Sequence, residues 1–440
     1  PPPLPLPRSR WPAPMRFLHL ADLHLDTLFA GRSREVRDRL RAASRDALSR
    51  GVDTALREEV DAVLLAGDVF DGERLSFVTE RFLVEQLQRL GEASIPVVMV
   101  TGNHDPGSGL AGSRRIPWPP GVTVIAGPEP RTVSIHRPDG SLAGTVTGAG
   151  HPDARTGEDL SRRLAPPESR STPAIALLHT HVTGAGGAAD HDRYAPSELP
   201  FLRSAGFDYW ALGHIHARQE LERMPAIWYA GNPQGRNPGE AGARGGLLVE
   251  VPARGATARV RFVELGSVRW ELLVLDGGLE DVTTLDELVA RVGQRWQEAR
   301  KADPGLPDGE WIVRVRLSGP CPLARELRSG ENREALADEL ARALGALEVE
   351  VRTGRIRTVL DPAPWLQRQD AAGAALRLVD ELARGDGPVL ARLGLTPGDL
   401  AGGEGEDDPD RGDERARALL RDHDGLRMLL EAFARQGGKT

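Results

Sequence analysis

Cysteine and lysine are scarce in this sequence, and long hydrophobic runs are missing. The single cysteine, Cys321, excludes an internal disulfide and a cysteine-based metal site, and this usage favours a reducing, cytoplasmic compartment. No apolar run approaches the roughly 18 to 20 residues that a membrane-spanning helix needs, so we expect no membrane partner. The proline-rich residues 1–14 lack the apolar core of a signal peptide, which predicts a disordered tail ahead of Met15.

Positive charge is carried almost entirely by arginine, because the only lysines are Lys301 and Lys439. The formal net charge of −8 excludes a globally basic nucleic-acid binder but is compatible with a local basic groove. Any such groove would use guanidinium groups, which pair well with phosphate. The length of 440 residues predicts two or three domains.

Apolar segments and helical segments alternate in the first part of the chain. Strands are expected near 17–20, 62–66, 95–100, 173–178 and 208–212, with helical periodicity from Val36 to Ala47 and over 77–90. This order predicts an α/β layered domain over 15–266. The composition shifts near Gly266, and 267–362 is predicted to be a smaller α+β unit. Residues 363–440 are predicted to be mainly helical, with an acidic linker over 402–414 and a last helix over 415–433.

Metal-binding types of side chain follow five of the predicted strands. They are Asp22 and His24, Asp68, Asn103 and His104, His179, and His214 with His216. Asp-x-His and His-x-His place alternate side chains on one face of an extended chain, so each pair is able to enter one pocket. Carboxylate, imidazole and amide donors without thiolate suit Mn, Fe or Zn. The set is large enough for two metals that share Asp68, an arrangement that suits phosphoester hydrolysis.

Simpler interpretations exist for single members of this set. Asp68 follows Gly67 and could cap a turn, and 102–105 could be only a tight turn. His181 repeats the His-x-His spacing after His179, and its role stays open. The remaining histidines are expected to be structural: His19, His136, His151, His191 and His423.

The motifs and their order resemble the calcineurin-like metallophosphoesterase superfamily. The residues that carry the resemblance are Asp22-x-His24, Gly67-Asp68-x-x-Asp71, Gly102-Asn103-His104-Asp105, His179 and Gly213-His214-x-His216. Within the superfamily the chain is similar to bacterial DNA-repair exonucleases of the SbcD and YhaO type, on segments 17–26, 190–196, 209–216 and 230–236. The resemblance implies a four-layer αββα sandwich, a smaller α+β capping domain and a helical C-terminal region.

The resemblance also implies a role for each motif residue. One metal would be held by Asp22, His24 and His216, and the other by Asn103, His179 and His214. Asp68 would bridge two divalent ions, for which the family usually prefers Mn²⁺. His104 would face the scissile phosphate, and Asp105 is expected to orient His104 by a hydrogen bond. Asp71 is expected to cap a helix or to support the ligands from behind.

A metal-dependent DNA nuclease is therefore the leading hypothesis, and the resemblance implies 3′ to 5′ exonuclease and single-strand endonuclease action. DNA contacts are expected from loop arginines, foremost Arg193 and Arg236, with Arg74, Arg114 and Arg115 also placed after catalytic strands. The resemblance further implies a coiled-coil ATPase partner of the SbcC type and a homodimer. The C-terminal helices could dock on that ATPase or pack on their own protein.

Two other functions stay open on the sequence. The first is a phosphomonoesterase or cyclic-nucleotide phosphodiesterase on the same fold. The second is a weakly active subunit that only recruits an ATPase, although a pure scaffold would have no use for so complete a ligand set.

Overall fold

A computed structural model describes residues 14–71, 75–110, 116–166, 171–185, 192–303, 310–359, 363–383 and 388. Contacts divide the chain into two compact units, the first being Pro1–Leu275 with Val289–Arg316 and Arg333–Arg352. The second is Asp276–Leu288 with Leu317–Asn332 and Thr353–Thr440. The predicted tail up to residue 13, the acidic linker and the last helix lie outside the described residues, as do Arg74, Arg114 and Arg115. The boundaries expected at 266 and 362 stay predictions.

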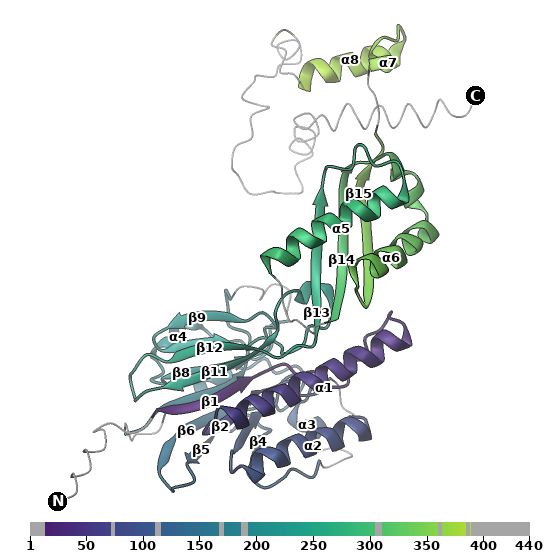
Figure 1. The fold of residues 1–440 in the computed structure, drawn as a ribbon. Helices are drawn as coiled ribbons and strands as arrows, with labels where there is room; N and C mark the ends of the chain where they lie inside the picture. Colours follow the sequence, from purple (N-terminus) through teal and green to yellow (C-terminus); the bar gives the residue numbers. More distant parts are fainter. Residues whose placement is uncertain are drawn as a thin grey trace, which may run out of the picture. The chain divides into compact units, whose positions relative to one another are not determined.

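Two six-stranded sheets form the main body of the first unit (Figure 1). The first sheet has the order β12 (Arg259–Glu264), β11 (Gly245–Val251), β1 (Met15–Leu20), β2 (Ala62–Ala66), β3 (Val97–Val100), β4 (Val122–Ile125). The second has the order β5 (Arg131–His136), β6 (Leu142–Ala149), β7 (Ala174–His179), β8 (Tyr209–Gly213), β10 (Ala226–Tyr229), β9 (Gln219–Arg223). Strands β1 to β4 pair in parallel, and so do β6, β7, β8 and β10.

Three hydrophobic clusters separate four layers in this body. One cluster joins residues of both sheets, including Phe17 of β1, Leu64 of β2 and Leu177 of β7, so the sheets face each other. A second lies between the first sheet and helices α1 (Arg34–Arg57) and α2 (Phe77–Glu92). A third covers the outer face of the second sheet with α4 (Leu199–Ser204) and the short turn Leu160–Arg163. The predicted layered α/β fold is confirmed, with α1 longer than expected and β9 not foreseen.

The chain that follows contains a smaller sheet. Its strands are β13 (Val268–Asp276), β14 (Glu310–Pro320) and β15 (Glu348–Arg357), in that order. Helix α5 (Leu285–Ala302) connects the first two strands, and α6 (Gly330–Leu344) precedes the third. Two short helices complete the described chain, α7 (Ala363–Leu366) and α8 (Ala371–Ala383), and α3 (Gly107–Leu110) lies after β3. Among the described residues, no helix is both long and apolar enough to cross a membrane.

Candidate metal centre

The predicted ligands follow the carboxyl ends of β1, β2, β3, β7 and β8, which all run parallel to a sheet neighbour. Each of these strands is buried along most or all of its length, because mainly apolar side chains fill both faces. Parallel strands deliver their carboxyl ends to one edge, which is where α/β sheets bind ligands. The structure therefore brings together side chains that are up to 194 positions apart in the chain, from Asp22 to His216.

The backbone is strained where these side chains leave the sheets. Asp22, His24, Asp68 and His214 all adopt positive φ, at 53°, 43°, 51° and 102°. Non-glycine residues rarely adopt such angles, and they persist at functional sites where the surrounding structure holds them in place. Gly67 (φ 82°) completes the turn before Asp68, and a Cβ there would lie 2.5 Å from Nδ1 of His179. The glycine is thus required for the close approach of the two strand ends.

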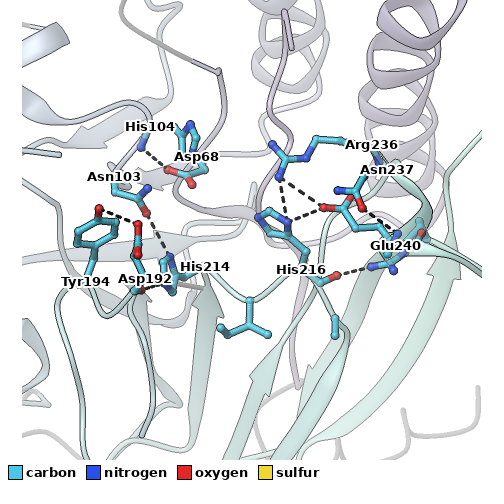
Figure 2. Close-up of a pocket in the computed structure, with 14 residues that line it drawn as sticks. Asp68, Asn103, His104, Asp192, Tyr194, His214, His216, Arg236, Asn237 and Glu240 are labelled. Carbon is cyan, nitrogen blue, oxygen red and sulfur yellow. Dashed lines mark hydrogen bonds and ion pairs between the residues drawn. The ribbon is translucent and has the colours of Figure 1, made fainter. Parts of the chain in front are cut away.

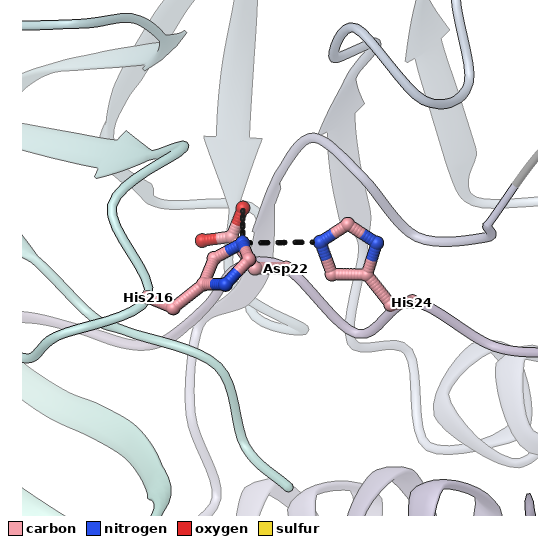
Figure 3. A group of neighbouring side chains, drawn as sticks. All are labelled: Asp22, His24 and His216. Carbon is pink, nitrogen blue, oxygen red and sulfur yellow. Dashed lines mark hydrogen bonds and ion pairs between the residues drawn. The ribbon is translucent and has the colours of Figure 1, made fainter. Parts of the chain in front are cut away.

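Asp22, His24 and His216 form one group of potential ligands (Figure 3). Nε2 of His24 and Nε2 of His216 are 3.2 Å apart, and Oδ1 of Asp22 is 4.0 Å from Nε2 of His216. Metal–nitrogen bonds of about 2.0–2.1 Å place neighbouring ligand atoms about 3 Å apart. The spacing of the two imidazole nitrogens is that of two ligands on one ion.

Asn103, His179 and His214 form the second group. Oδ1 of Asn103 lies 3.0 Å from Nε2 of His179 and 3.2 Å from Nδ1 of His214. The other ring nitrogens meet backbone carbonyls: Nδ1 of His179 donates to Ala66 O at 2.9 Å, and Nε2 of His214 donates to Asp192 O at 2.8 Å. When neutral, each ring would therefore turn its lone pair toward Asn103.

Asp68 lies between the two groups. Its Oδ2 is 3.6 Å from Nε2 of His24 and 3.4 Å from Nε2 of His179, while its Oδ1 accepts the backbone N–H of His104 at 2.9 Å. One carboxylate oxygen thus faces a ligand of each group, as expected for a bridging residue.

The charges of this centre suit a cation. Asp22 and Asp68 are both 1% exposed, and in the described part of the chain their ion-pair partners are histidines. Burial alone would lower the pKa of His179, but the carboxylates of Asp68 and Asp22 raise it to about 9. Burial and the charge of Arg236 lower the pKa of His24 to about 3, so His24 stays neutral and able to coordinate. The negative charge that holds a proton on His179 would equally hold a divalent ion, and the donor set fits one.

His104 pairs with Asp71 and not with Asp105, which corrects the sequence-based expectation. Nδ1 of His104 lies 2.6 Å from Oδ1 of Asp71, and this hydrogen bond raises the pKa of His104. Asp71 also lies 3.7 Å from Nδ1 of His24. Asp105 is buried away from the ring and accepts backbone N–H groups of Asp68, Val69 and Gly102 at 3.2, 2.8 and 2.7 Å. The carboxylate next to His104 in sequence is thus used to join the loops after β2 and β3.

This arrangement predicts a stability defect for Asp105→Ala. Three buried N–H donors would lose their acceptor, and each costs about 1–3 kcal/mol when left unsatisfied. We expect the free energy of unfolding, measured by urea titration, to fall by at least about 3 kcal/mol. Asp105→Asn keeps one acceptor oxygen and should lose less. A loss below about 1 kcal/mol in the alanine variant would contradict the assigned role.

A cavity of ≈ 720 Å³ opens beside these side chains. Figure 2 shows Asp68, Asn103, His104 and His214 on one side and His216 with Arg236 and Glu240 on the other. The cavity also includes Asp192 and Tyr194, and Arg193 is exposed between them. Of the two predicted DNA contacts, Arg236 thus lines the cavity, whereas Arg193 is exposed and stands in sequence between two residues that line it.

His181 is buried and packs edge-on against His214, with ring centroids 5.9 Å apart. It lies outside the groups of potential ligands found among the described residues. Two of the other histidines have structural contacts as predicted: His19 contacts Tyr209 and Leu212, and His151 donates to the carbonyl of His179 at 2.8 Å.

Comparison with known proteins identifies the family to which these features belong. Residues 15–218 match the model of the calcineurin-like phosphoesterases, and residues 250–359 match that of the middle domain of metallophosphoesterase YhaO. The uncharacterized metallophosphoesterase YhaO of Bacillus subtilis is 34% identical over 316 residues, which are 70% of this chain and 72% of that protein. The chain belongs to the calcineurin-like metallophosphoesterases.

Two other relatives are named as a component of a nuclease and as a DNA repair protein. The SbcD component of the nuclease SbcCD from Bacillus subtilis is 28% identical over 314 residues, covering 62% of this chain and 76% of the relative. The DNA double-strand break repair protein Mre11 of Sulfurisphaera tokodaii is 27% identical over 233 residues, covering 50% and 54%. This metallophosphoesterase is therefore a hydrolase of phosphoester bonds, related to nucleases.

Sequence reasoning missed one buried residue of this metallophosphoesterase site. Glu240 accepts a hydrogen bond from Nδ1 of His216 at 2.8 Å, and Arg236 lies beside it. Burial would raise the pKa of Glu240, but the bond from His216 and the charge of Arg236 outweigh it and hold the pKa below its usual value. The only local signal was the capped turn Asn-Pro-Gly-Glu at 237–240, which does not reveal what the glutamate contacts.

Proposed function

We propose that the chain is a metal-dependent DNA nuclease that uses two divalent cations, with Mn²⁺ as the expected metal. The observation that carries the proposal is the spacing of the lone-pair atoms in the two ligand groups, with Asp68 facing both. Asp22, His24 and His216 would hold one cation, and Asn103, His179 and His214 the other. Two such cations supply Lewis-acid stabilisation of the attacking and leaving oxygens in an in-line displacement.

His104 would act on the leaving oxygen. Its Nδ1 is taken by Asp71 at 2.6 Å, which leaves Nε2 for the cavity that the ring lines. The raised pKa of His104 favours the protonated ring, so Nε2–H would donate its proton as the ester bond breaks. Asp71 holds the ring in this orientation and stabilises its charge.

DNA is the proposed substrate because named relatives are a component of a nuclease and a DNA repair protein. Arg236 lines the cavity and would bind a phosphate next to the scissile bond, and Arg193, exposed between two lining residues of the sequence, would bind a phosphate further along. We expect the protein to cleave DNA as a 3′ to 5′ exonuclease and as a single-strand endonuclease. Residues 267–362 would serve as a capping domain that helps to select DNA.

An ATPase of the SbcC type is the proposed partner, because one of the relatives is a component of the nuclease SbcCD. The expected docking region is 363–440, of which the described part is α7 and α8. A homodimer through the nuclease domain is also expected.

The test compares nucleic-acid and small-molecule substrates with the same purified protein. Stripped with a chelator, the protein should degrade neither end-labelled linear duplex nor circular single-stranded DNA, and added Mn²⁺ should restore both activities. If the protein hydrolyses p-nitrophenyl phosphate or cyclic nucleotides but leaves the DNA uncleaved, the result would favour a small-molecule phosphoesterase. No hydrolysis of any phosphoester would favour a scaffold for an ATPase.

The matched control is Asp208→Asn. Asp208 is a buried carboxylate that accepts backbone N–H groups, but it precedes β8, whereas His214 follows that strand. This variant should retain metal-dependent DNA cleavage, which separates a specific loss from a general loss of stability.

A further inference from the structure

We propose that Glu240 is a positioning residue that fixes the tautomer and orientation of His216, and so determines the affinity of one of the two metal positions. The inference rests on the proposed metal centre, in which His216 is a ligand. Glu240 is not itself a member of the group of potential ligands formed by Asp22, His24 and His216, so it would support a ligand rather than bind the metal.

The hydrogen bonds of Glu240 define which ring nitrogen of His216 carries the proton. Oε1 of Glu240 is 2.8 Å from Nδ1 of His216, and an ionised carboxylate only accepts. Nδ1 therefore bears the hydrogen, and Nε2 presents its lone pair toward Nε2 of His24. Nη2 of Arg236 lies 3.0 Å from the same Nδ1, but a protonated Nδ1 cannot accept a hydrogen bond. Nη2 therefore donates to Oε1 of Glu240, which is 3.5 Å away.

The second oxygen of Glu240 is also fully used. Oε2 accepts from Nδ2 of Asn232 at 2.7 Å and from the backbone N–H of Arg236 at 2.6 Å. Glu240 is 7% exposed, so water does not readily replace these partners. A carboxylate held by several donors at once has little freedom to turn, which makes it a rigid support for the imidazole.

The local chain is built to bring Glu240 to this place. Asn237 caps the turn Pro238–Glu240 by accepting from the N–H of Gly239, and proline suits the first position of such a turn. Gly231 (φ 73°) lets the segment approach His216, since a Cβ there would lie 2.7 Å from the His216 carbonyl oxygen. That oxygen accepts the N–H of Asn232 at 3.2 Å and a guanidinium N–H of Arg244. The segment thus holds both the backbone and the ring of His216.

The effect should be confined to one metal position. In the second group the rings of His179 and His214 donate to the carbonyls of Ala66 and Asp192, so none of the hydrogen bonds found there involves Glu240. Loss of a carboxylate that orients a metal-bound histidine typically weakens metal binding by about 10–100-fold. We expect Glu240→Gln to weaken one Mn²⁺ site by this factor and to leave the other unchanged.

Glutamine is the most specific replacement because it keeps the size of the glutamate side chain and one acceptor oxygen. If its NH₂ faces His216, the ring must turn a lone pair toward it and place the proton on Nε2, where it blocks coordination. If its NH₂ faces the other way, it meets the donors of Asn232 and Arg236. Either arrangement disturbs the support.

The experiment counts Mn²⁺ bound to chelator-treated protein by equilibrium dialysis and follows its electron paramagnetic resonance spectrum. Wild type and Asp208→Asn should each bind two Mn²⁺ ions and give the spectrum of a coupled pair. Glu240→Gln should bind one Mn²⁺ ion tightly and give the spectrum of isolated Mn²⁺. Two ions bound by Glu240→Gln with affinities within about threefold of wild type would overturn the inference alone. Failure of wild type to bind Mn²⁺ would overturn the proposed function as well.

A second measurement needs no folded variant at position 240. Nitrogen-15 spectra of histidine-labelled wild-type protein distinguish the two ring tautomers, and His216→Gln identifies the signals of His216. The inference expects hydrogen on Nδ1 of His216 in the metal-free protein. Hydrogen on Nε2 would overturn it.

Discussion

Replacing Asp68 by asparagine should reduce DNA hydrolysis by at least about 10³-fold, since two-metal stabilisation of the transition state contributes several kcal/mol. Asp68 uses both carboxylate oxygens. One accepts the N–H of His104 at 2.9 Å, and the other faces His24 and His179 at 3.6 and 3.4 Å. An amide offers one oxygen and one NH₂ group, so asparagine satisfies one of these two functions and places a donor against the other.

The measurement combines activity with metal content. We expect Asp68→Asn to lose DNA cleavage. Because Asp68 faces both metal positions, the variant should also bind Mn²⁺ weakly at both of them. Asp208→Asn changes the same chemical group before β8, at the end of that strand opposite to His214, and should behave as wild type in both assays. Wild-type activity in Asp68→Asn would refute the assigned centre, whatever its metal content.

Replacing His104 by alanine should lower kcat by about 10²–10⁴-fold, the usual contribution of a positioned acid or base. The side chain of His104 is 41% exposed at the cavity, and its contacts are with Asp71 and the ring of His24. Its backbone N–H, which binds Asp68, is kept in the alanine variant. We therefore expect two bound Mn²⁺ ions and an almost unchanged KM.

Asp71→Asn tests the proposed role of His104 by changing its hydrogen-bond partner. It removes the carboxylate that holds Nδ1 of His104 and should reduce kcat less than His104→Ala, by roughly tenfold, as for other carboxylates that orient a histidine. The two changes should be less than additive, because both act through one ring. Loss of Mn²⁺ binding in His104→Ala, or full additivity, would contradict a role in proton transfer.

Much of the candidate centre was predictable from the sequence because each ligand follows an apolar strand. Local patterns identify a buried strand and the polar residue at its end, and parallel pairing then brings such ends to one edge. Asp22, Asp68 and His179 are separated by long stretches of chain, yet each is found by the same local rule.

The partners of the supporting carboxylates were not predictable in the same way. Asp105 is adjacent to His104 in sequence but binds backbone groups, whereas Asp71 reaches the ring from a different strand end. Glu240 reaches His216 across 24 positions from a turn with no apolar periodicity. These contacts depend on how loops cross above the sheets, which no local period encodes.

The left-handed backbone at Asp22, His24, Asp68 and His214 implies a trade-off between the thermal stability of the fold and its activity. A left-handed angle costs an ordinary residue roughly 1–2 kcal/mol, and glycine would relieve it. A search for heat-resistant variants that ignored catalysis would therefore select against these four side chains. At these positions the proposed chemistry and the stability of the backbone place opposite demands on the residue.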